Sequence, residues 1–234
     1  MASACGGTSS RLVKYSLVVS VWVAACHLNP AQKLFPRHFK MVIKNQTIEK
    51  FLEELSSKAP TPGGGAVAAV VGAMAAALVE MVASLSLSKD KEEKFREIGK
   101  KADKLRKELL SMADEDCQVF EKVMKAYRLP KESNKQQETR NKEIQEALKK
   151  AAQVPLETAQ KSAEALKLAS FCAQKGNQNA VSDARVGIEL ATAAVYGALE
   201  NVKINLESIK DSKFCEDLKE KIDELLECED LKAS

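Results

Sequence analysis

The chain has 234 residues and a net charge of +3, with 45% hydrophobic, 29% charged and only 5% aromatic residues. This composition supports a domain with a substantial core and favours helices, because sheets are enriched in aromatic and β-branched residues. Residues 1–40 hold five Lys or Arg and no acid, so the remaining 31 basic and 33 acidic residues nearly balance. A near-neutral body lacks the basic face of a nucleic-acid-binding protein, and we expect no nucleic-acid partner.

The positions of cysteine and histidine argue against a metal centre. Both histidines, His27 and His38, precede residue 41, and the six cysteines are scattered: Cys5, Cys26, Cys117, Cys172, Cys215 and Cys228. A structural zinc site needs clustered ligands. We therefore expect no metal, and a cytoplasmic protein with reduced cysteines. Acid–base chemistry after residue 40 then relies on carboxylates, Lys, Tyr or Cys.

The first 40 residues allow three interpretations. The apolar run SLVVSVWVAAC after Arg11 and Lys14 has the length and charge of a signal-peptide core, and the lack of acids also suits an organellar transit sequence. Alternatively, the functional chain begins at Met41, which is the interpretation we favour. We treat 1–40 as an N-terminal extension and 41–230 as a helical domain. The run is too short to cross a bilayer, which needs about 20 residues, so we expect no membrane association.

The helical domain is predicted to begin with a short amphipathic helix that Asn45 or Thr47 caps. The segment APTPGGG breaks it, and a second helix runs from Gly65 to about residue 87. A highly charged third helix covers about 89–127 and ends at the loop RLPKESNKQQ.

A fourth helix is predicted over about 138–174, with Pro155 inside it. An interior proline costs about 3 kcal/mol, so we expect a kink or a break near Val154. Two more helices, over about 180–207 and 213–228, complete the chain. Short connections predict an all-α, antiparallel up-and-down helical bundle of about six helices.

The second helix is predicted to be the buried, Ala/Gly-rich member of the bundle. It has about 15 uncharged residues between Gly65 and Glu80, too few to span a bilayer. Small residues such as Gly72 allow neighbouring backbones to approach closely. Three glycines precede it and expose amide donors at the positive end of the helix dipole: Gly63, Gly64 and Gly65. Such a surface suits a carboxylate, a phosphate or a polarised carbonyl, and the alternative is a plain turn.

Several acids occupy positions where apolar residues belong. Asp116 lies on a stripe with spacings of 4, 3, 4, 3 and 4: Leu109, Ala113, Asp116, Phe120, Val123 and Tyr127. Burying an unpartnered carboxylate costs several kcal/mol, so this position indicates a partner or a site, unless the helix is slightly rotated. Glu80 is a second inward acid, for which a partner such as Lys is the simpler explanation.

The helix predicted over about 180–207 also carries an acid on its inner side, because Asp183 begins an inward stripe. The helix dipole alone favours an acid in the first turn, so this position has a structural explanation as well. Asn201 and Asn205 are one turn apart and could share a polar partner.

Five blocks in one order carry a resemblance: TPGGGAVAAVVGAM, DEDCQVFEKVMKAYRLPK, AAQVPLETA, GNQNAVSDA and NVKINL. Together they resemble the cyclodeaminase domain of formiminotransferase-cyclodeaminase and its stand-alone bacterial relatives, some assigned as methenyltetrahydrofolate cyclohydrolases. The resemblance is collinear from about residue 41 to 227. We recognise no counterpart of residues 1–40 in this family, and we expect no formiminotransferase domain on this chain.

The resemblance implies an all-helical domain that assembles as a homodimer or a higher homo-oligomer and binds reduced folate in a cleft beside the glycines. It places the catalytic aspartate on Asp116 and the family's Ser-Asp pair on Ser182 and Asp183, so Asp116 and Asp183 are the candidate catalytic residues. The candidate substrate-binding residues are Gly63, Gly64, Gly65, Phe120, Asn177, Asn179, Ser182, Asn201 and Asn205.

The predicted function is conversion of 5-formiminotetrahydrofolate to 5,10-methenyltetrahydrofolate and ammonia. The alternatives are methenyltetrahydrofolate cyclohydrolase activity and a non-catalytic helical bundle, either folate-binding or a scaffold. Both ends of the first reaction are cationic, so a half-buried Asp116 could stabilise the cations and move the proton. A tetrahydrofolate derivative is then the substrate, and a lysine such as Lys175 could meet the carboxylates of its glutamate tail.

Overall fold

The computed structural model describes residues 42–88, 92–228 and 231, all within the unit Met41–Ser234. The predicted N-terminal extension and both histidines lie outside the described residues. Within them, the chain forms six α-helices and two short 3-10 helices, which confirms the all-α prediction. In chain order these are η2 (Ile43–Asn45), α2 (Ile48–Leu55), α3 (Gly64–Leu85), α4 (Glu92–Tyr127), α5 (Asn134–Lys175), η3 (Gln178–Ala180), α6 (Val181–Leu206) and α7 (Ser212–Leu226).

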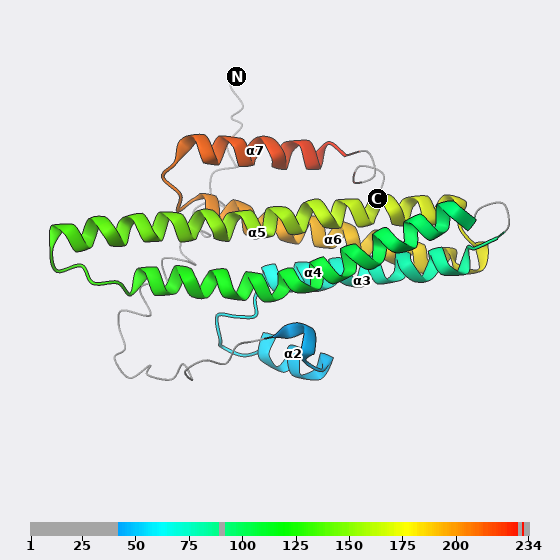
Figure 1. Ribbon diagram of the computed structural model, residues 1–234, viewed down its shortest axis with the longest axis horizontal. Helices are drawn as coiled ribbons and strands as arrows, with labels where there is room; N and C mark the ends of the chain where they lie inside the picture. Colours follow the sequence, from blue (N-terminus) through cyan, green and yellow to red (C-terminus); the bar gives the residue numbers. More distant parts are fainter. Residues whose placement is uncertain (1–41, 89–91, 229–230, 232–234) are drawn as a thin grey trace, which may run out of the picture. The chain divides into compact units, whose positions relative to one another are not determined.

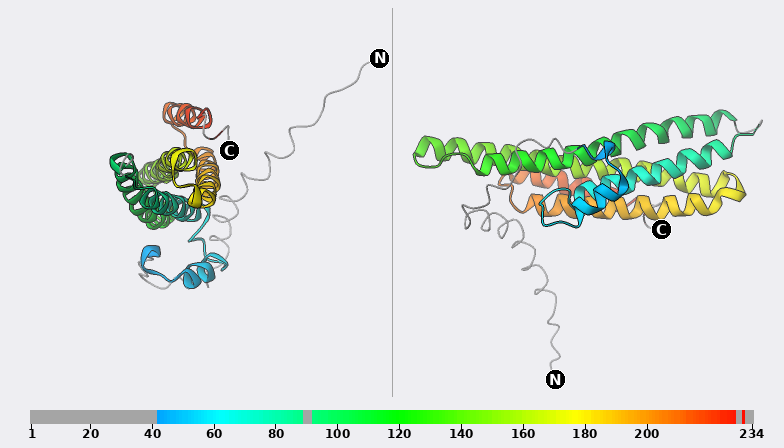
Figure 2. Two further views of the ribbon diagram at one scale, coloured as in Figure 1. Left: turned by 90° about the vertical axis from the view of Figure 1, so that its right-hand side faces the viewer. Right: turned by 90° about the horizontal axis from the view of Figure 1, so that it is seen from below.

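Four long helices, α3 to α6, form the core of the domain (Figure 1). The buried helix α3 packs against α4, α5 and α6, while α5 also packs against α4 and α6. Seen end-on, α2 and α7 lie on opposite sides of these four helices (Figure 2). The predicted bundle of about six helices is therefore a four-helix core with two peripheral helices.

Small residues let α3 occupy the centre, as predicted. A Cβ added at Gly72 would lie 2.5 Å from Ser162 Oγ on α5 and 3.4 Å from Ala194 Cβ on α6. Among the described helices, α3 alone is long and apolar enough to cross a membrane, with a mean hydropathy of 2.2. Its packing against three other helices identifies it as the core helix of this domain.

The interior proline neither breaks nor ends α5, and this part of the prediction is wrong. The helix is continuous from Asn134 to Lys175 with Pro155 inside it. Proline lacks an N–H, so the carbonyl of Ala151 loses its usual helical donor. Asn205 on α6 replaces that donor, because its Nδ2 lies 2.9 Å from Ala151 O. A side chain 54 positions from Ala151 thus satisfies the carbonyl that the proline leaves without a donor.

Two helix starts depend on caps. Thr47 caps α2 by accepting a hydrogen bond from the backbone N–H of Lys50. Ser133 and Gln136 form a capping box, so α5 begins at Asn134, inside the segment that we predicted to be a loop. The capping signature Ser-x-x-Gln is visible in the sequence and outweighs the polar, turn-like composition around it.

Candidate functional site

The glycine turn, defined as Gly63, Gly64 and Gly65, lies directly against Asp116. Gly63 is the N-cap of α3 and provides no side-chain hydrogen bond to the helix. Asp116 on α4 provides one instead, by accepting a hydrogen bond from the backbone N–H of Ala66. A Cβ added at Gly65 would lie 2.7 Å from Asp116 Cγ and 2.9 Å from its Oδ2. Only glycine leaves room for the carboxyl group at this point.

Burial gives Asp116 an altered acidity. Removal from water raises its pKa from 3.8 to about 6, and the hydrogen bond from Ala66 offsets only part of this rise. A carboxyl group with a pKa near 6 is mostly ionised at pH 7, yet it accepts and returns a proton readily. Asp116 therefore has the acidity expected of a general acid–base catalyst, and the prediction that it faces inward agrees with its position.

Asn201 and Phe120 flank this contact. The side chain of Asn201 on α6 lies next to the turn, with Nδ2 3.4 Å and Oδ1 3.7 Å from a Cβ added at Gly64. Its Nδ2 donates to Gly197 O at 2.8 Å, which leaves Oδ1 as an acceptor beside the turn. Phe120 is half-buried and stands one helical turn after Asp116 on α4. The site therefore combines an acid, bare backbone amides, one amide carbonyl and one aromatic ring.

The described residues near Asp116 provide neither a reactive thiol nor a cluster of metal ligands. Cys117 follows Asp116 but points into the core, where burial and the nearby acids raise its pKa to about 12. Its thiol stays protonated and is no nucleophile at neutral pH. Among the described residues, no group of three His, Cys, Asp or Glu side chains is arranged to hold a metal ion.

Four predicted site residues form a separate far group: Asn177, Asn179, Ser182 and Asp183. Helices α3 and α6 are antiparallel, so Asn201 meets the start of α3, whereas the far group lies near its end. Asp183 and Asn201 are 18 residues apart on α6, or about 27 Å at 1.5 Å per residue. A single chain therefore does not bring the two catalytic candidates together.

Asn177 also has a clear structural role in the far group. Its backbone N–H donates to Ser86 Oγ at 2.8 Å, and its Nδ2 donates to Leu85 O at 2.9 Å. Its Oδ1 accepts from the backbone N–H of Asn179. These bonds join the end of α3 to the turn between α5 and α6, at the same end of the bundle as Lys175.

Two further polar residues are structural. Glu80 pairs with Arg106 on α4, with Oε2 and Nε 3.0 Å apart, so its partner is Arg and not the Lys that we expected. The Nδ2 of Asn205 donates to Ala151 O and to Asn201 O. The donor of Asn205 is therefore fully used in this support of α5, and its predicted substrate-binding role stays a prediction.

Sequence reasoning missed Asp114. This acid is only 6% exposed, and its Oδ1 accepts a hydrogen bond from the backbone N–H of Ile43 at 2.5 Å. The two residues are 71 positions apart. The helical stripe that identifies Asp116 cannot reveal Asp114, which lies on another face of α4 and faces the segment before α2.

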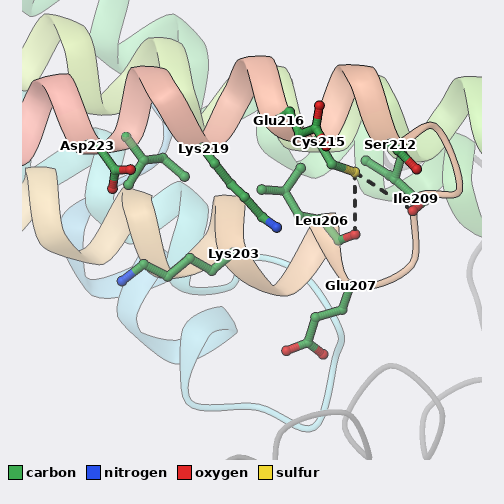
Figure 3. Close-up of a pocket in the computed structure, with 10 residues that line it drawn as sticks. Lys203, Leu206, Glu207, Ile209, Ser212, Cys215, Glu216, Lys219 and Asp223 are labelled. Atoms are coloured by element: carbon green, nitrogen blue, oxygen red, sulfur yellow. Dashed lines mark hydrogen bonds between the residues drawn. The ribbon is translucent and has the colours of Figure 1, made fainter.

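A cavity of about 610 Å³ lies between α6 and α7 (Figure 3). Leu206, Ile209 and Ile222 line it, and Figure 3 shows Lys219 pointing from α7 toward α6. None of the predicted site residues contributes to it, and its Lys, Asp and Glu side chains are all exposed. The acidity of Asp116 and its contact with a helix N-terminus make the glycine turn the stronger candidate site.

Comparisons with known proteins point in one direction. A profile of the formiminotransferase-cyclodeaminase family matches residues 47–224. A methenyltetrahydrofolate cyclohydrolase from Methylorubrum extorquens is 42% identical over 186 residues, covering 78% of this chain and 89% of that protein. Formimidoyltransferase-cyclodeaminase from Gallus gallus is 34% identical over 76% of this chain but only 34% of its own length. The solved structure of formiminotetrahydrofolate cyclodeaminase from Thermotoga maritima aligns with a TM-score of 0.73 at 33% identity, covering 82% of this chain and 92% of its own.

Proposed function

Because the chain belongs to the formiminotransferase-cyclodeaminase family, we propose that it is a folate one-carbon enzyme that acts on the carbon between N5 and N10. The leading reaction is hydrolysis of 5,10-methenyltetrahydrofolate to 10-formyltetrahydrofolate. Its support is the similarity to a cyclohydrolase along 89% of that protein's length. The single observation that carries the chemistry is the half-buried Asp116 in contact with the glycine turn.

In this reaction the methenyl carbon is cationic and water is the nucleophile. Asp116 takes a proton from the water as its oxygen bonds to the carbon, and the carboxylate stabilises the cation before attack. The carbon–N5 bond then breaks, the protonated Asp116 returns that proton to N5, and the hydroxyl on the carbon releases its own proton to solvent as the formyl C=O forms. A pKa of about 6 suits both steps, because the same group must accept and release a proton near neutral pH.

The remaining groups of the site have binding roles in this proposal. The N-terminal amides of α3 face polar oxygen atoms of the substrate, since the positive end of a helix dipole favours such atoms. Asn201 Oδ1 accepts hydrogen bonds from N–H groups of the pterin, and the Phe120 ring packs against the flat part of the molecule.

Cyclodeamination is the second candidate, supported by the similarity to the solved Thermotoga maritima enzyme. There N10 attacks the formimino carbon, and ammonia leaves from the tetrahedral intermediate to give the methenyl cation. Asp116 would take the N10 proton and deliver it to the departing nitrogen. The two reactions differ in the nucleophile, water or N10, and require the same acid–base group.

The oligomeric state forms the second part of the proposal. The outer face of α3 and α6 exposes large apolar side chains, each 39–54% accessible: Met74, Met81, Leu85, Val186 and Tyr196. We propose that two copies pack through this face about a two-fold axis across the middle of α3. Because the copies then run antiparallel, the far group of one copy approaches the glycine turn of the other. This arrangement would unite Asp116 with a partner's Ser182 and Asp183.

The oligomer proposal is tested by complementation. Asp116→Asn and Asp183→Ala are each expected to abolish most activity, while their mixture forms heterodimers with one intact site. Random mixing should recover about a quarter of wild-type activity. Light scattering that reports a monomer, or a mixture as inactive as its components, would contradict the shared site.

The reaction is tested by absorbance of the methenyl group. Loss of the signal from 5,10-methenyltetrahydrofolate reports hydrolysis, and its appearance from 5-formiminotetrahydrofolate reports cyclodeamination. Asp116→Asn should lower turnover by about 10²–10⁴-fold, the usual contribution of an acid–base catalyst. The matched control is Asp103→Asn on the same helix, whose carboxyl pairs with Arg106 and Lys107. Near-wild-type turnover by Asp116→Asn would exclude the proposed role.

A further inference from the structure

The segment before the glycine turn, residues 42–62, is attached to α4 at its start, and the helix that follows it is attached to α4 as well; we name this segment the arm. At its start, the backbone N–H of Ile43 donates to Asp114 Oδ1 at 2.5 Å. Just beyond its end, the backbone N–H of Ala66 donates to Asp116. The two acids are two residues apart on α4 and point to different faces, so the arm and the start of α3 are held to the same turn of α4, the one that carries the proposed catalytic group.

Between these attachments only part of the arm is buried. Ile43 and Phe51 are buried in the cluster that includes Ala66, Ala113 and Cys117, the residues around Asp116. In contrast, Ile48 is 70% and Leu52 is 53% exposed, so the apolar stripe of α2 is only half covered. The hydrogen bond from Ile43 and the burial of Ile43 and Phe51 therefore act together to hold the arm against the long helices.

Packing alone does not explain an aspartate at position 114, because burying its carboxyl group carries a desolvation cost. Its side chain is 6% exposed, and no Lys or Arg side chain lies within ion-pair distance of it among the residues that the structure describes. A buried carboxyl group without a cation loses its hydration, and an apolar side chain of similar size would avoid this cost. The bond to Ile43 is the compensation that the structure provides.

From these observations we propose that Asp114 is a positioning residue: it holds Ile43, and thereby sets the arm and the glycine turn that follows it around Asp116. The inference rests on the proposed function for its kinetic consequence, but its structural content does not. Loss of the Asp114 acceptor should loosen the arm selectively and weaken folate binding, while Asp116 keeps its own contact with Ala66.

The experiment combines hydrogen exchange with kinetics on the full chain. In Asp114→Ala, backbone amides of the arm should exchange about tenfold faster than in wild type, as one buried hydrogen bond is lost. The KM for 5,10-methenyltetrahydrofolate should rise about tenfold with kcat changed less than about threefold, because binding and not the proton transfer is affected. Asp103→Ala, the same truncation at a partly exposed position of α4, should change neither quantity.

Asp114→Asn keeps the volume and one acceptor oxygen, so it should fold even if Asp114→Ala does not. Its arm should exchange at a rate between those of wild type and Asp114→Ala, and its KM should lie near the wild-type value. The inference is overturned if the arm of Asp114→Ala exchanges no faster than that of Asp103→Ala, or if faster exchange spreads evenly over α4 and α5. An inactive wild-type protein would refute the proposed function, and the exchange measurement would still decide the role of Asp114.

Discussion

Replacing Gly65 with alanine tests whether the contact with Asp116 is the basis of activity. Alanine normally stabilises a helix relative to glycine by about 0.5–1 kcal/mol. At Gly65 the new Cβ would stand 2.7 Å from Asp116 Cγ and 2.9 Å from Oδ2. Carbon atoms prefer contacts of about 3.5–4.0 Å, so the carboxyl group must move by about 1 Å. A displacement of that size at a catalytic group costs about 100-fold in rate.

We therefore expect Gly65→Ala to lower kcat/KM by about 100-fold, measured by methenyl absorbance. Overpacking of about 1–3 kcal/mol opposes the gain in helix propensity, so the free energy of unfolding should fall by only about 1 kcal/mol. Gly99→Ala is the matched control, since its Cβ would lie 3.9 Å from Ala83 Cβ, an ordinary contact. It should keep wild-type activity and gain about 0.5–1 kcal/mol in stability. Wild-type kcat/KM in Gly65→Ala would refute the assignment of the site.

Three further predictions concern stability and can be measured by urea unfolding. The pKa of Asp116 is raised from 3.8 to about 6, so the stability that its protonated form contributes is fully present below pH 3.8 and is lost as the pH rises through 6. Relative to wild type, the free energy of unfolding of Asp116→Asn should therefore increase by about 3 kcal/mol between pH 3.5 and pH 8. A difference that does not change with pH would contradict this. Gly72→Ala places a Cβ 2.5 Å from Ser162 Oγ and should cost about 1–3 kcal/mol, with partial recovery in the double variant with Ser162→Ala; equal costs in both backgrounds would show that Ser162 is not the obstacle. Asn205→Ala should lower the free energy of unfolding by about 1–3 kcal/mol, because it leaves Ala151 O without a donor. This cost should be smaller in a Pro155→Ala background, where the restored backbone N–H donates to the same carbonyl. Additive costs of the two substitutions would show that Asn205 does not replace the N–H missing at Pro155.

The fold follows from local patterns that the sequence displays. Apolar spacing defines the long helices, and the same spacing places Asp116 on the inner side of α4. The composition of α3 is sufficient to predict its central position, because a helix that is apolar on all sides must be covered. The start of α5 was predictable too, since Ser133 and Gln136 carry a capping signature.

The predictions that were wrong or incomplete share one physical cause: the contact that decides each outcome is made by a residue far away in the sequence. Pro155 is tolerated because Asn205 replaces the lost donor, and nothing near Pro155 indicates this. Asp114 is held by Ile43 across 71 positions. The far group was assigned together with the glycine turn, yet the direction of α6 puts about 27 Å between Asp183 and Asn201. A motif in the sequence specifies residue types and order, but it does not specify which ends of antiparallel helices meet.

The start of α3 joins the stability of the domain to its chemistry. With no capping side chain of its own, this helix takes its acceptor from Asp116, and the glycine at position 65 is what allows the approach. The same approach buries the carboxyl group and raises its pKa to about 6. Asp116 therefore contributes least to the stability of the domain near neutral pH, where an acid–base catalyst is needed. Asparagine at position 116 keeps an acceptor for Ala66 but cannot ionise. Greater stability and lost turnover in that one variant would therefore show that the domain holds Asp116 in place for its acidity and not for the cap.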